Sequence, residues 1–302
     1  SIEATVGGQK ARFMVDFGMF QGGREATAKN LEPLPFPPKE IDFVVLTHAH
    51  IDHSGLLPRL CAQGFAGPIY CTSATYELLK ILLLDSAHLQ RADVERAERK
   101  MKAGKWRGEV PVALYSREDV ELALAQFVSL DYGQSLELTP GIRLEFRNAG
   151  HILGSAIAVI DVAEDGYQKK RCVFSGDIGM KGKVLMPDPD LIRDANIVVV
   201  ESTYGDREHV VPTTDFEDAI KRTIARGGSV LIPAFAVDRT EVILVRLREL
   251  MEQGLIPRVP IYADSPMALK ALTFYRNAID EGSAEIRVEV RDAWRGRDPF
   301  DP

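Results

Sequence analysis

The sequence predicts an α/β protein: a layered sandwich of two β-sheets with outer helices, followed by a smaller unit of alternating helices and strands. Two observations predict this fold class. Up to about residue 200, short apolar runs bounded by turn residues are interspersed irregularly with helical stretches, which suits two packed sheets. Beyond about Val210, helices and apolar runs alternate regularly, which is typical of a small parallel α/β unit.

The first strands flank a loop rich in proline. β-Branched and aromatic residues dominate residues 12–17 and 42–47, so we expect a buried strand in each. Residues 33–38, between them, hold too many prolines for a helix or a central strand and should form a loop. Helical spacing then predicts helices at residues 54–63, 74–88 and 117–127. Ser116 and Asp119 have capping-box spacing at the start of the last one.

The remaining elements divide the chain into two domains. Before the change of pattern we expect strands at residues 141–147, 155–162, 171–174 and 196–200. After it we expect helices at residues 215–226, 240–253 and 267–278, with strands at 229–233 and 259–263 between them. We therefore assign residues 1–210 to a first domain and residues 211–302 to a second.

Composition excludes several classes of protein. The 302 residues are 45% hydrophobic and 27% charged, as in ordinary globular proteins. No apolar run approaches the ~18 residues of a membrane helix and no charged-then-apolar leader opens the chain, so we expect a cytoplasmic protein without a membrane partner. The three cysteines form no CxxC pair, which favours reduced core thiols. A net charge of −7 excludes a general basic surface, so any contact with nucleic acid must be local.

The most informative segment is the histidine-rich loop that follows the apolar residues 43–46. His48, His50 and His53, three of the six histidines, fall within six residues together with Asp52. In an extended loop residues two apart project the same way, so His48 and His50 can face one ion. Asp52 and His53, on the turn that follows, can face another. Loop histidines paired only with local backbone are the alternative, but four ligand-type residues at this spacing favour a metal site.

Two glycine-flanked loops offer further ligands. His151 lies within residues 149–155 and Asp177 within residues 174–179, where glycine lets the backbone come close to an ion. The complete predicted set is His48, His50 and His151 on one metal, Asp52 and His53 on the other, and Asp177 as the bridge. These ligand types are typical of zinc, so we expect two Zn²⁺ ions. Two ions ~3.5 to 4 Å apart would activate a water for hydrolysis, and Asp52 is placed to orient that water.

Three of these motifs, HAHIDH, AGHILGSA and SGDIG, resemble the successive motifs of the metallo-β-lactamase superfamily. Asp16, in the sequence VDFG, resembles the first aspartate of that family, which supports the site. The resemblance implies an αββα sandwich for the first domain. It also implies metal-assisted hydrolysis with Asp52 and Asp177 among the catalytic residues.

Later motifs resemble the β-CASP subfamily, whose members process nucleic acids and carry an inserted α/β cap domain. The segments are ESTYGDR from Glu201, IPAFAVDRTE from Ile232 and DSPMA from Asp264. The likeness to relatives of the mRNA 3′-end cleavage endonuclease implies hydrolysis of RNA phosphodiester bonds, with 5′ exonuclease action left open. Glutamate at position 201 goes with RNA rather than DNA in this subfamily, and it implies a catalytic role in supporting a general-acid histidine. Arg207, Arg239 and Ser265 are the substrate-binding residues that the resemblance indicates.

The subfamily's last two motifs, which supply that histidine and a final metal ligand, have no counterpart here. His209 and His88 are the unassigned histidines, and we expect a surface or groove position for His209 and a helix-packing role for His88. The resemblance thus implies a fold that is incomplete at both ends and a gene that continues past Pro302. The expected partners are single-stranded RNA and, through uncovered apolar surface, a second copy in a homodimer.

A basic stretch and two alternative functions complete the sequence-based expectations. Residues 91–107 hold seven Lys/Arg against three Asp/Glu, which fits a strip for an RNA backbone but fits the solvated face of a charged helix better. Trp106, near its end, is expected to pack rather than to stack on a base. A hydrolase of small esters or thioesters would share the fold, although it needs no long groove. A non-catalytic scaffold subunit is the second alternative, although the metal motifs are intact here.

Overall fold

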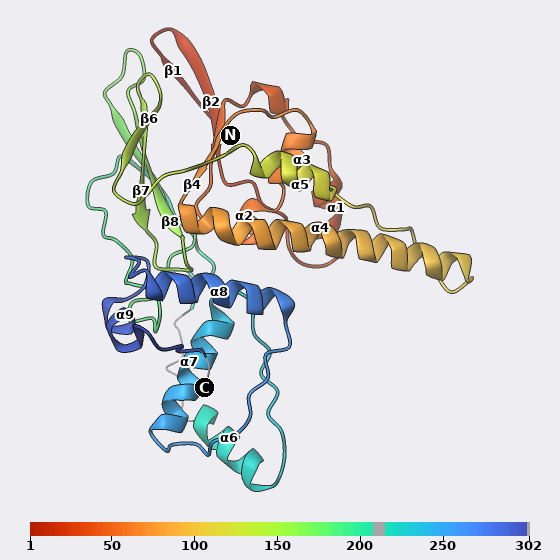
Figure 1. The fold of residues 1–302 in the computed structure, drawn as a ribbon. Helices are drawn as coiled ribbons and strands as arrows, with labels where there is room; N and C mark the ends of the chain where they lie inside the picture. Colours follow the sequence, from red (N-terminus) through yellow and green to blue (C-terminus); the bar gives the residue numbers. More distant parts are fainter. Residues whose placement is uncertain (208–214, 301–302) are drawn as a thin grey trace. The chain divides into compact units, whose positions relative to one another are not determined.

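The structure, a computed structural model, describes residues 1–207 and 215–300 (Figure 1). It divides into two compact units. The first comprises residues 1–179 and 189–200, and the second comprises residues 180–188 and 201–302. The predicted domain boundary after residue 210 lies outside the described residues and stays a prediction. Among the described helices, none is both long and apolar enough to cross a membrane.

The first unit contains two five-stranded sheets, which confirms the predicted sandwich. The first sheet follows chain order: β1 (Ile2–Val6), β2 (Gln9–Val15), β3 (Phe43–Val45), β4 (Ile69–Cys71) and β5 (Phe127–Ser129). Its first two strands form an antiparallel hairpin, and the later neighbours pair in parallel. The second sheet follows the order β10 (Ile197–Val199), β9 (Lys170–Phe174), β8 (Ala156–Val162), β7 (Ile142–Asn148) and β6 (Ser135–Thr139). Its strands are antiparallel except for the parallel pair β9 and β10.

The core of this unit lies between the two sheets. In β7 every second residue, Ile142, Leu144 and Phe146, is buried in it. Phe13 of β2 and Phe43 of β3 join the same core with their rings stacked, 4.9 Å apart between centroids. β8 is buried along its whole length because it is the middle strand of its sheet. This packing fixes the strand ends from which the histidine-bearing loops project.

Helices lie along the outer side of the first sheet (Figure 1). They are α1 (Arg24–Leu31), the 3-10 helix Pro38–Glu40, α2 (Ile51–Ser54), α3 (Leu57–Ala62), α4 (Ser73–Lys102) and α5 (Arg117–Leu124). The single helix predicted over residues 54–63 is wrong, because the chain forms α2 and α3 instead. Pro58 has no N–H to donate to the carbonyl of Ser54, so a continuous helix breaks here. The capping box of Ser116 and Asp119 is present at the start of α5.

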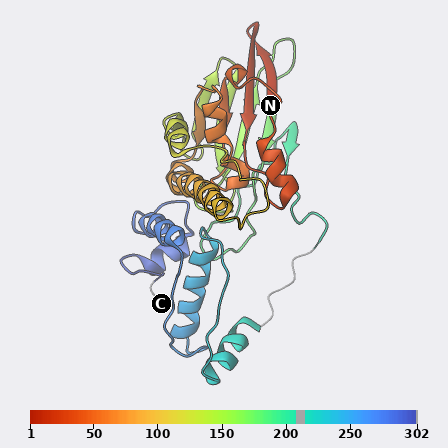
Figure 2. The ribbon, with the colours of Figure 1, turned by 90° about the vertical axis from the view of Figure 1, so that its right-hand side faces the viewer.

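Helix α4 is much longer than the sequence pattern predicts. It continues from the expected end near residue 88 to Lys102. The apolar stripe fades there, but residues 89–102 are mostly strong helix formers, and the pairs Arg91–Glu95 and Asp93–Arg96 add support at helical spacing. Figure 2, in which α4 points toward the viewer, shows this helix beside the sheets of the first unit.

Strand β10 forms an exposed edge of the second sheet. It pairs with β9 on one side, and no strand of the described residues pairs with its other side. Ile197, Val198 and Val199 are between 50% and 60% exposed, and Val200 continues this apolar run. An apolar edge strand of this kind is a template for pairing with another chain.

The second unit contains α6 (Asp215–Ala225), α7 (Arg239–Glu252), α8 (Pro266–Asp280) and α9 (Val288–Trp294). The strands predicted at residues 229–233 and 259–263 are wrong, since neither segment pairs into a sheet within the described residues. One face of each segment is partly buried, because Ile232 and Ile261 pack against the cluster around Leu250 of α7. The other face is open, with Leu231 91% and Tyr262 88% exposed. An apolar run predicts burial, but a strand also needs a neighbour for its backbone groups.

Candidate metal centre

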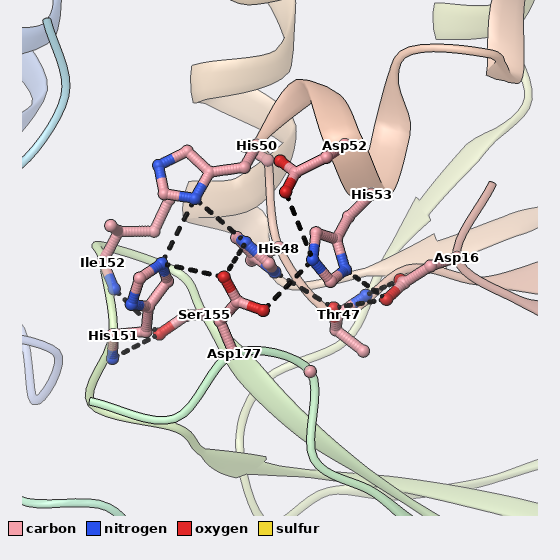
Figure 3. A network of polar contacts seen from close by, with 12 residues as sticks. Asp16, Thr47, His48, His50, Asp52, His53, His151, Ile152, Ser155 and Asp177 are labelled. Atoms are coloured by element: carbon pink, nitrogen blue, oxygen red, sulfur yellow. Dashed lines mark hydrogen bonds and ion pairs between the residues drawn. The ribbon is translucent and has the colours of Figure 1, made fainter. Parts of the chain in front are cut away.

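Loops from both sheets bring six polar side chains together at one end of the sandwich (Figure 3). They are His48, His50, Asp52 and His53 from the segment between β3 and α3, His151 from the loop between β7 and β8, and Asp177 from the loop after β9. A backbone hydrogen bond joins two of these three segments. The N–H of Ala156 donates to the carbonyl of Thr47 at 2.8 Å, which ties the start of β8 to the histidine-rich loop.

Four of these side chains form a group able to hold a metal ion, here called the four-ligand cluster: His48, His50, His151 and Asp177. One ligand atom of each lies within 4.8 Å of the others. His50 Nδ1 lies 3.1 Å from His48 Nε2 and 3.2 Å from His151 Nε2. Asp177 Oδ2 lies 3.5 Å from His151 Nε2 and 3.8 Å from His48 Nε2. Ligand atoms ~2.05 Å from a tetrahedral zinc ion lie ~3.3 Å apart, so these spacings fit an ion at the centre.

The second carboxylate oxygen of Asp177 faces the other part of the site. Asp177 Oδ1 lies 3.1 Å from His53 Nε2, and Asp52 Oδ2 lies 4.0 Å from the same nitrogen. The two oxygens of Asp177 therefore point to two different groups of ligand atoms. The Asp52 side chain, at 48% exposed, is the most accessible of these groups, and it can reach a water or a substrate.

Asp16 holds the histidine-rich loop in place from the end of β2. Its Oδ1 accepts a hydrogen bond from the N–H of Thr47 at 2.8 Å. Its Oδ2 accepts a hydrogen bond from the Thr47 hydroxyl at 2.8 Å and lies 2.7 Å from His53 Nδ1. The backbone of Asp16 has φ of 57°, a conformation that few non-glycine residues adopt. The contacts support the predicted site-supporting role, because they fix which nitrogen His53 presents to the centre.

Glycine permits close backbone approach at two places in the site. A Cβ at Gly18 would lie 1.6 Å from the carbonyl oxygen of Asp52, and a Cβ at Gly179 would lie 1.7 Å from that of Gly150. Neither position has room for a side chain. Because the N–H of Gly179 donates to the carbonyl of Ala149 at 2.8 Å, this contact also joins the Asp177 loop to the His151 loop.

Burial and charge set the protonation of the site. Burial lowers the pKa of His48 well below its ordinary value, and the neighbouring histidines add to this effect, so His48 stays in the neutral form that binds metals. Burial acts to lower the pKa of His53 as well. Its hydrogen bonds to Asp16 and Asp177 outweigh burial and raise that pKa to about 10 in the metal-free chain, so an ion bound at His53 Nε2 would displace a proton. The hydrogen bond with His53 in turn lowers the pKa of Asp177.

Two hydroxyl groups serve the site without having been predicted. The Thr47 hydroxyl lies 3.1 Å from His48 Nδ1, so it turns His48 Nε2 toward the cluster. Ser155 Oγ accepts the N–H groups of His151 and Ile152, at 3.0 and 3.1 Å, and closes the tight turn that carries His151. Thr47 directly precedes the HAHIDH motif and Ser155 lies within AGHILGSA, and this closeness to the ligand residues is the signal that could have identified them.

The remaining predicted residues belong to other parts of the chain. Glu201, Arg207, Arg239 and Ser265 belong to the second unit. Ser265 caps α8, because its hydroxyl accepts the N–H of Ala268 at 3.2 Å, and Arg207 pairs with Asp206 at 3.1 Å. The helix-packing role expected for His88 is wrong: its side chain is exposed on α4, where the helix outruns the body of the unit. His209 lies outside the described residues.

Comparison with known proteins identifies relatives for most of the chain. The pattern of the family described as "Metallo-beta-lactamase superfamily" matches residues 5–234. Ribonuclease TTHA0252 of Thermus thermophilus is 38% identical over 96% of this chain and 61% of its own length. Transcription termination factor FttA of Methanosarcina mazei is 36% identical over 96% of this chain and 43% of its own length.

A third similar protein is the "RNase J-like protein" of Methanocaldococcus jannaschii, which is 30% identical over 94% of this chain and 60% of its own length. The chain therefore spans less than two thirds of the length of each of these curated relatives.

Proposed function

The chain belongs to the metallo-β-lactamase superfamily, and from this premise we propose that it is a metal-dependent ribonuclease. Membership confirms the family that the three motifs predicted. The observation that carries the proposal is the four-ligand cluster, whose spacing fits a metal ion. The names of the relatives, which include a ribonuclease, an RNase J-like protein and a transcription termination factor, support RNA as the substrate.

The donor set supports two zinc ions. One would be held by the four-ligand cluster. The other would be held by Asp52, His53 and Asp177, whose spacings around His53 Nε2 are 3.1 and 4.0 Å. Asp177 would serve both ions because its two oxygens point to different groups of ligand atoms. Histidine and carboxylate ligands of this kind are typical of zinc sites.

The residues of the chain divide the chemistry between them. When bound at these residues, divalent ions would increase the acidity of a water and would offset the negative charge that develops on the phosphoryl group. Asp52 orients the attacking water, because its carboxylate is the most exposed in the centre. Asp16 and Thr47 keep the histidine rings aligned. Glu201 supports the group that protonates the leaving oxygen, and Arg207, Arg239 and Ser265 contact the RNA.

The substrate we propose is single-stranded RNA in the cytoplasm. His48 is fully buried whereas Asp52 of the same centre is exposed, and a flexible strand adapts its shape to such a site more easily than a rigid duplex. A homodimer is the proposed assembly, supported by the exposed edge of β10.

Replacing ligands tests this function. In a protein with His48→Ala and His50→Ala, zinc measured by elemental analysis should fall by at least one ion per chain, because the four-ligand cluster is lost, and cleavage of a labelled RNA should vanish. Asp177→Asn keeps the shape of the bridge but removes its charge, so metal content and cleavage should fall together, cleavage by roughly 100-fold or more. His88→Ala, an exposed histidine outside the centre, is the matched control. Unchanged zinc content in the double variant would contradict the proposal.

A second substrate separates the alternative functions. A chromogenic ester offered to the same proteins should turn over far more slowly than RNA. Faster turnover of the ester would identify an esterase on this fold. Zinc bound at full occupancy with neither reaction is the result expected of a non-catalytic scaffold, and also of a chain that lacks the general-acid histidine.

A further inference from the structure

The second half of α4 extends beyond the body of the first unit and carries a surplus of positive charge (Figure 1). We call residues 89–102 the α4 arm. The segment 91–107 holds seven Lys/Arg against three Asp/Glu, in a chain whose net charge is −7. The basic residues of the arm are all exposed: Arg91, Arg96, Arg99, Lys100 and Lys102. Positive charge is therefore concentrated on one projecting element of an acidic chain.

Only part of this charge is neutralised within the helix. Arg91 pairs with Glu95 at 2.9 Å and Arg96 with Asp93 at 3.3 Å, and both are exposed pairs of the kind that contribute little stability. Arg99, Lys100 and Lys102 have no carboxylate partner in the described part of the chain. Their ammonium and guanidinium groups are available to an external anion.

Three of these side chains lie along a single ridge. Arg96, Arg99 and Lys102 are spaced by three residues, so each stands about one helical turn beyond the last, roughly 4.5 Å further along the axis. We call them the basic ridge. Ala97, the buried residue of this segment, lies on another side of the helix. A ridge of cations at regular intervals matches a chain of phosphates rather than a single anion.

Stabilisation of the helix end explains only some of this charge. Basic residues in the last turn of a helix interact favourably with the helix dipole. However, Arg96 precedes that turn, and Lys105 and Arg107 continue the charge beyond the end of the helix. Basic residues therefore lie both before and after the last turn of the helix, where the helix dipole acts.

The other end of the same helix is attached to the metal centre. The hydroxyls of Thr72 and Thr75 donate to the carbonyl of Gly154 at 2.7 and 2.8 Å, in the loop that carries His151. Along α4 the basic ridge then lies roughly 30 to 40 Å from that loop. A single stiff helix thus connects the candidate catalytic loop to the ridge.

We propose that the α4 arm binds the phosphodiester backbone of single-stranded RNA through the basic ridge and holds the part of the strand that lies away from the metal centre. The inference deepens the proposed ribonuclease function and rests on it. Contact with the backbone involves no base, so binding is independent of sequence and depends strongly on salt. A long RNA gains affinity from the α4 arm because it can contact the metal centre and the basic ridge at once. An oligonucleotide of a few nucleotides is too short to reach both.

Binding of a labelled 30-nucleotide RNA without secondary structure, measured over a series of KCl concentrations, tests the arm. In the basic-ridge variant, Arg96→Gln with Arg99→Gln and Lys102→Gln, Kd should rise at least about tenfold at low salt, and the slope of log K against log salt should flatten by roughly 2. Glutamine is also a good helix former, so circular dichroism should be unchanged. The matched control changes three exposed cations on strands: Lys10→Gln, Arg143→Gln and Lys170→Gln. Its Kd should change less than about twofold, because it alters net charge equally but leaves the arm intact.

Equal Kd and equal salt slope in both variants would overturn the proposal and leave another kind of partner, such as an acidic protein, for the ridge. Cleavage kinetics give a second readout. The variant should raise KM for the 30-nucleotide RNA but not for a five-nucleotide RNA, and kcat should stay the same for both. If no form of the protein cleaves RNA, the proposed function fails, while the binding series still decides whether the arm binds the backbone.

Discussion

Each unit of this protein holds one aspartate in an unusual backbone conformation, and the two differ in what surrounds them. Asp16 in the first unit has φ of 57° and Asp238 in the second has φ of 67°; among the described residues no other non-glycine residue has positive φ. The carboxylate of Asp16 contacts Thr47 and His53 at the metal centre. At Asp238 the N–H of Arg239 donates to the carbonyl of Val237 at 2.9 Å, which makes a strained γ-turn.

The surroundings of the two aspartates differ in how completely their polar groups are paired. Around Asp16 the polar groups satisfy one another and hold metal ligands. Asp238 pairs with Lys183 at 3.3 Å, but close by in sequence Glu241 is fully buried, and neither of its carboxyl oxygens has a hydrogen-bond partner among the described residues. Burial raises the pKa of Glu241 to about 8, and the charge of Asp238 adds to the rise. Strain thus supports a complete polar network in one unit and accompanies an incomplete one in the other.

The largest effect is expected at Asp16. Asp16→Gly removes the strain but also three contacts of the carboxylate, so metal affinity should fall by roughly 10- to 100-fold, the usual consequence of losing a residue that orients a metal ligand. Isothermal titration of zinc into the metal-free protein measures this change. Asp16→Asn, which tolerates the same backbone conformation, should bind zinc with intermediate affinity. If the Asp16→Gly protein binds zinc as tightly as its parent, the contacts of Asp16 with Thr47 and His53 do not support metal binding.

An effect of intermediate size is expected at Glu241. Because its pKa is raised in the folded protein, its contribution to stability is complete below the unfolded pKa of about 4.5 and is lost as pH rises to about 8. From the pKa shift, roughly 3 to 5 kcal/mol should be lost over that range. Glu241→Gln should remove this loss, so the difference in unfolding free energy between the two proteins should grow from pH 5 to pH 8.

Trp294 fluorescence reports unfolding of the second unit if Trp106, the other tryptophan, is changed to phenylalanine in both proteins. Glu252→Gln, in the same helix but exposed, is the control and should leave the pH dependence unchanged. Parallel pH curves for the Glu241→Gln protein and its parent would show that the buried carboxyl does not titrate in this range.

The smallest effect is expected at Asp238. Asp238→Gly relieves a backbone strain of roughly 1 to 3 kcal/mol but loses the Lys183 pair and adds freedom to the unfolded chain, so the net gain should be about 1 kcal/mol. Thermal unfolding of the second unit measures it. Asp238→Ala keeps the strain and loses the pair, and it should therefore lower the unfolding temperature. If Asp238→Gly instead lowers stability, the carboxylate of Asp238 stabilises the fold by more free energy than the strained γ-turn costs.

The residues that gather at the candidate metal centre could be predicted from sequence because their spacing is local. His48, His50 and His53 sit on one short segment, and His151 and Asp177 each stand in a short glycine-bearing loop beside a predicted strand. The long strands were also predictable, since alternate burial leaves a clear pattern in residues such as those of β7. The three-residue strands β4 and β5 are too short to give such a pattern.

Features that depend on distant partners escaped prediction. The conformation of Asp16 is favoured by Thr47 and His53, which are far away in sequence. The apolar segments 229–233 and 259–263 have the composition of strands, but no neighbouring strand pairs with them. By contrast, Pro58 carried a local signal for the break between α2 and α3 that outweighs the helical spacing around it.

The free edge of β10 has a practical meaning for anyone who concentrates this protein. A row of outward-facing backbone groups between half-exposed valines resembles the growing tip of a fibril, which extends by capturing one more strand. Concentrated solutions should therefore turn turbid after a lag that shortens when preformed aggregates are added. A lysine in place of Val198 would lengthen that lag, because each new strand would bring a charge against the one before it.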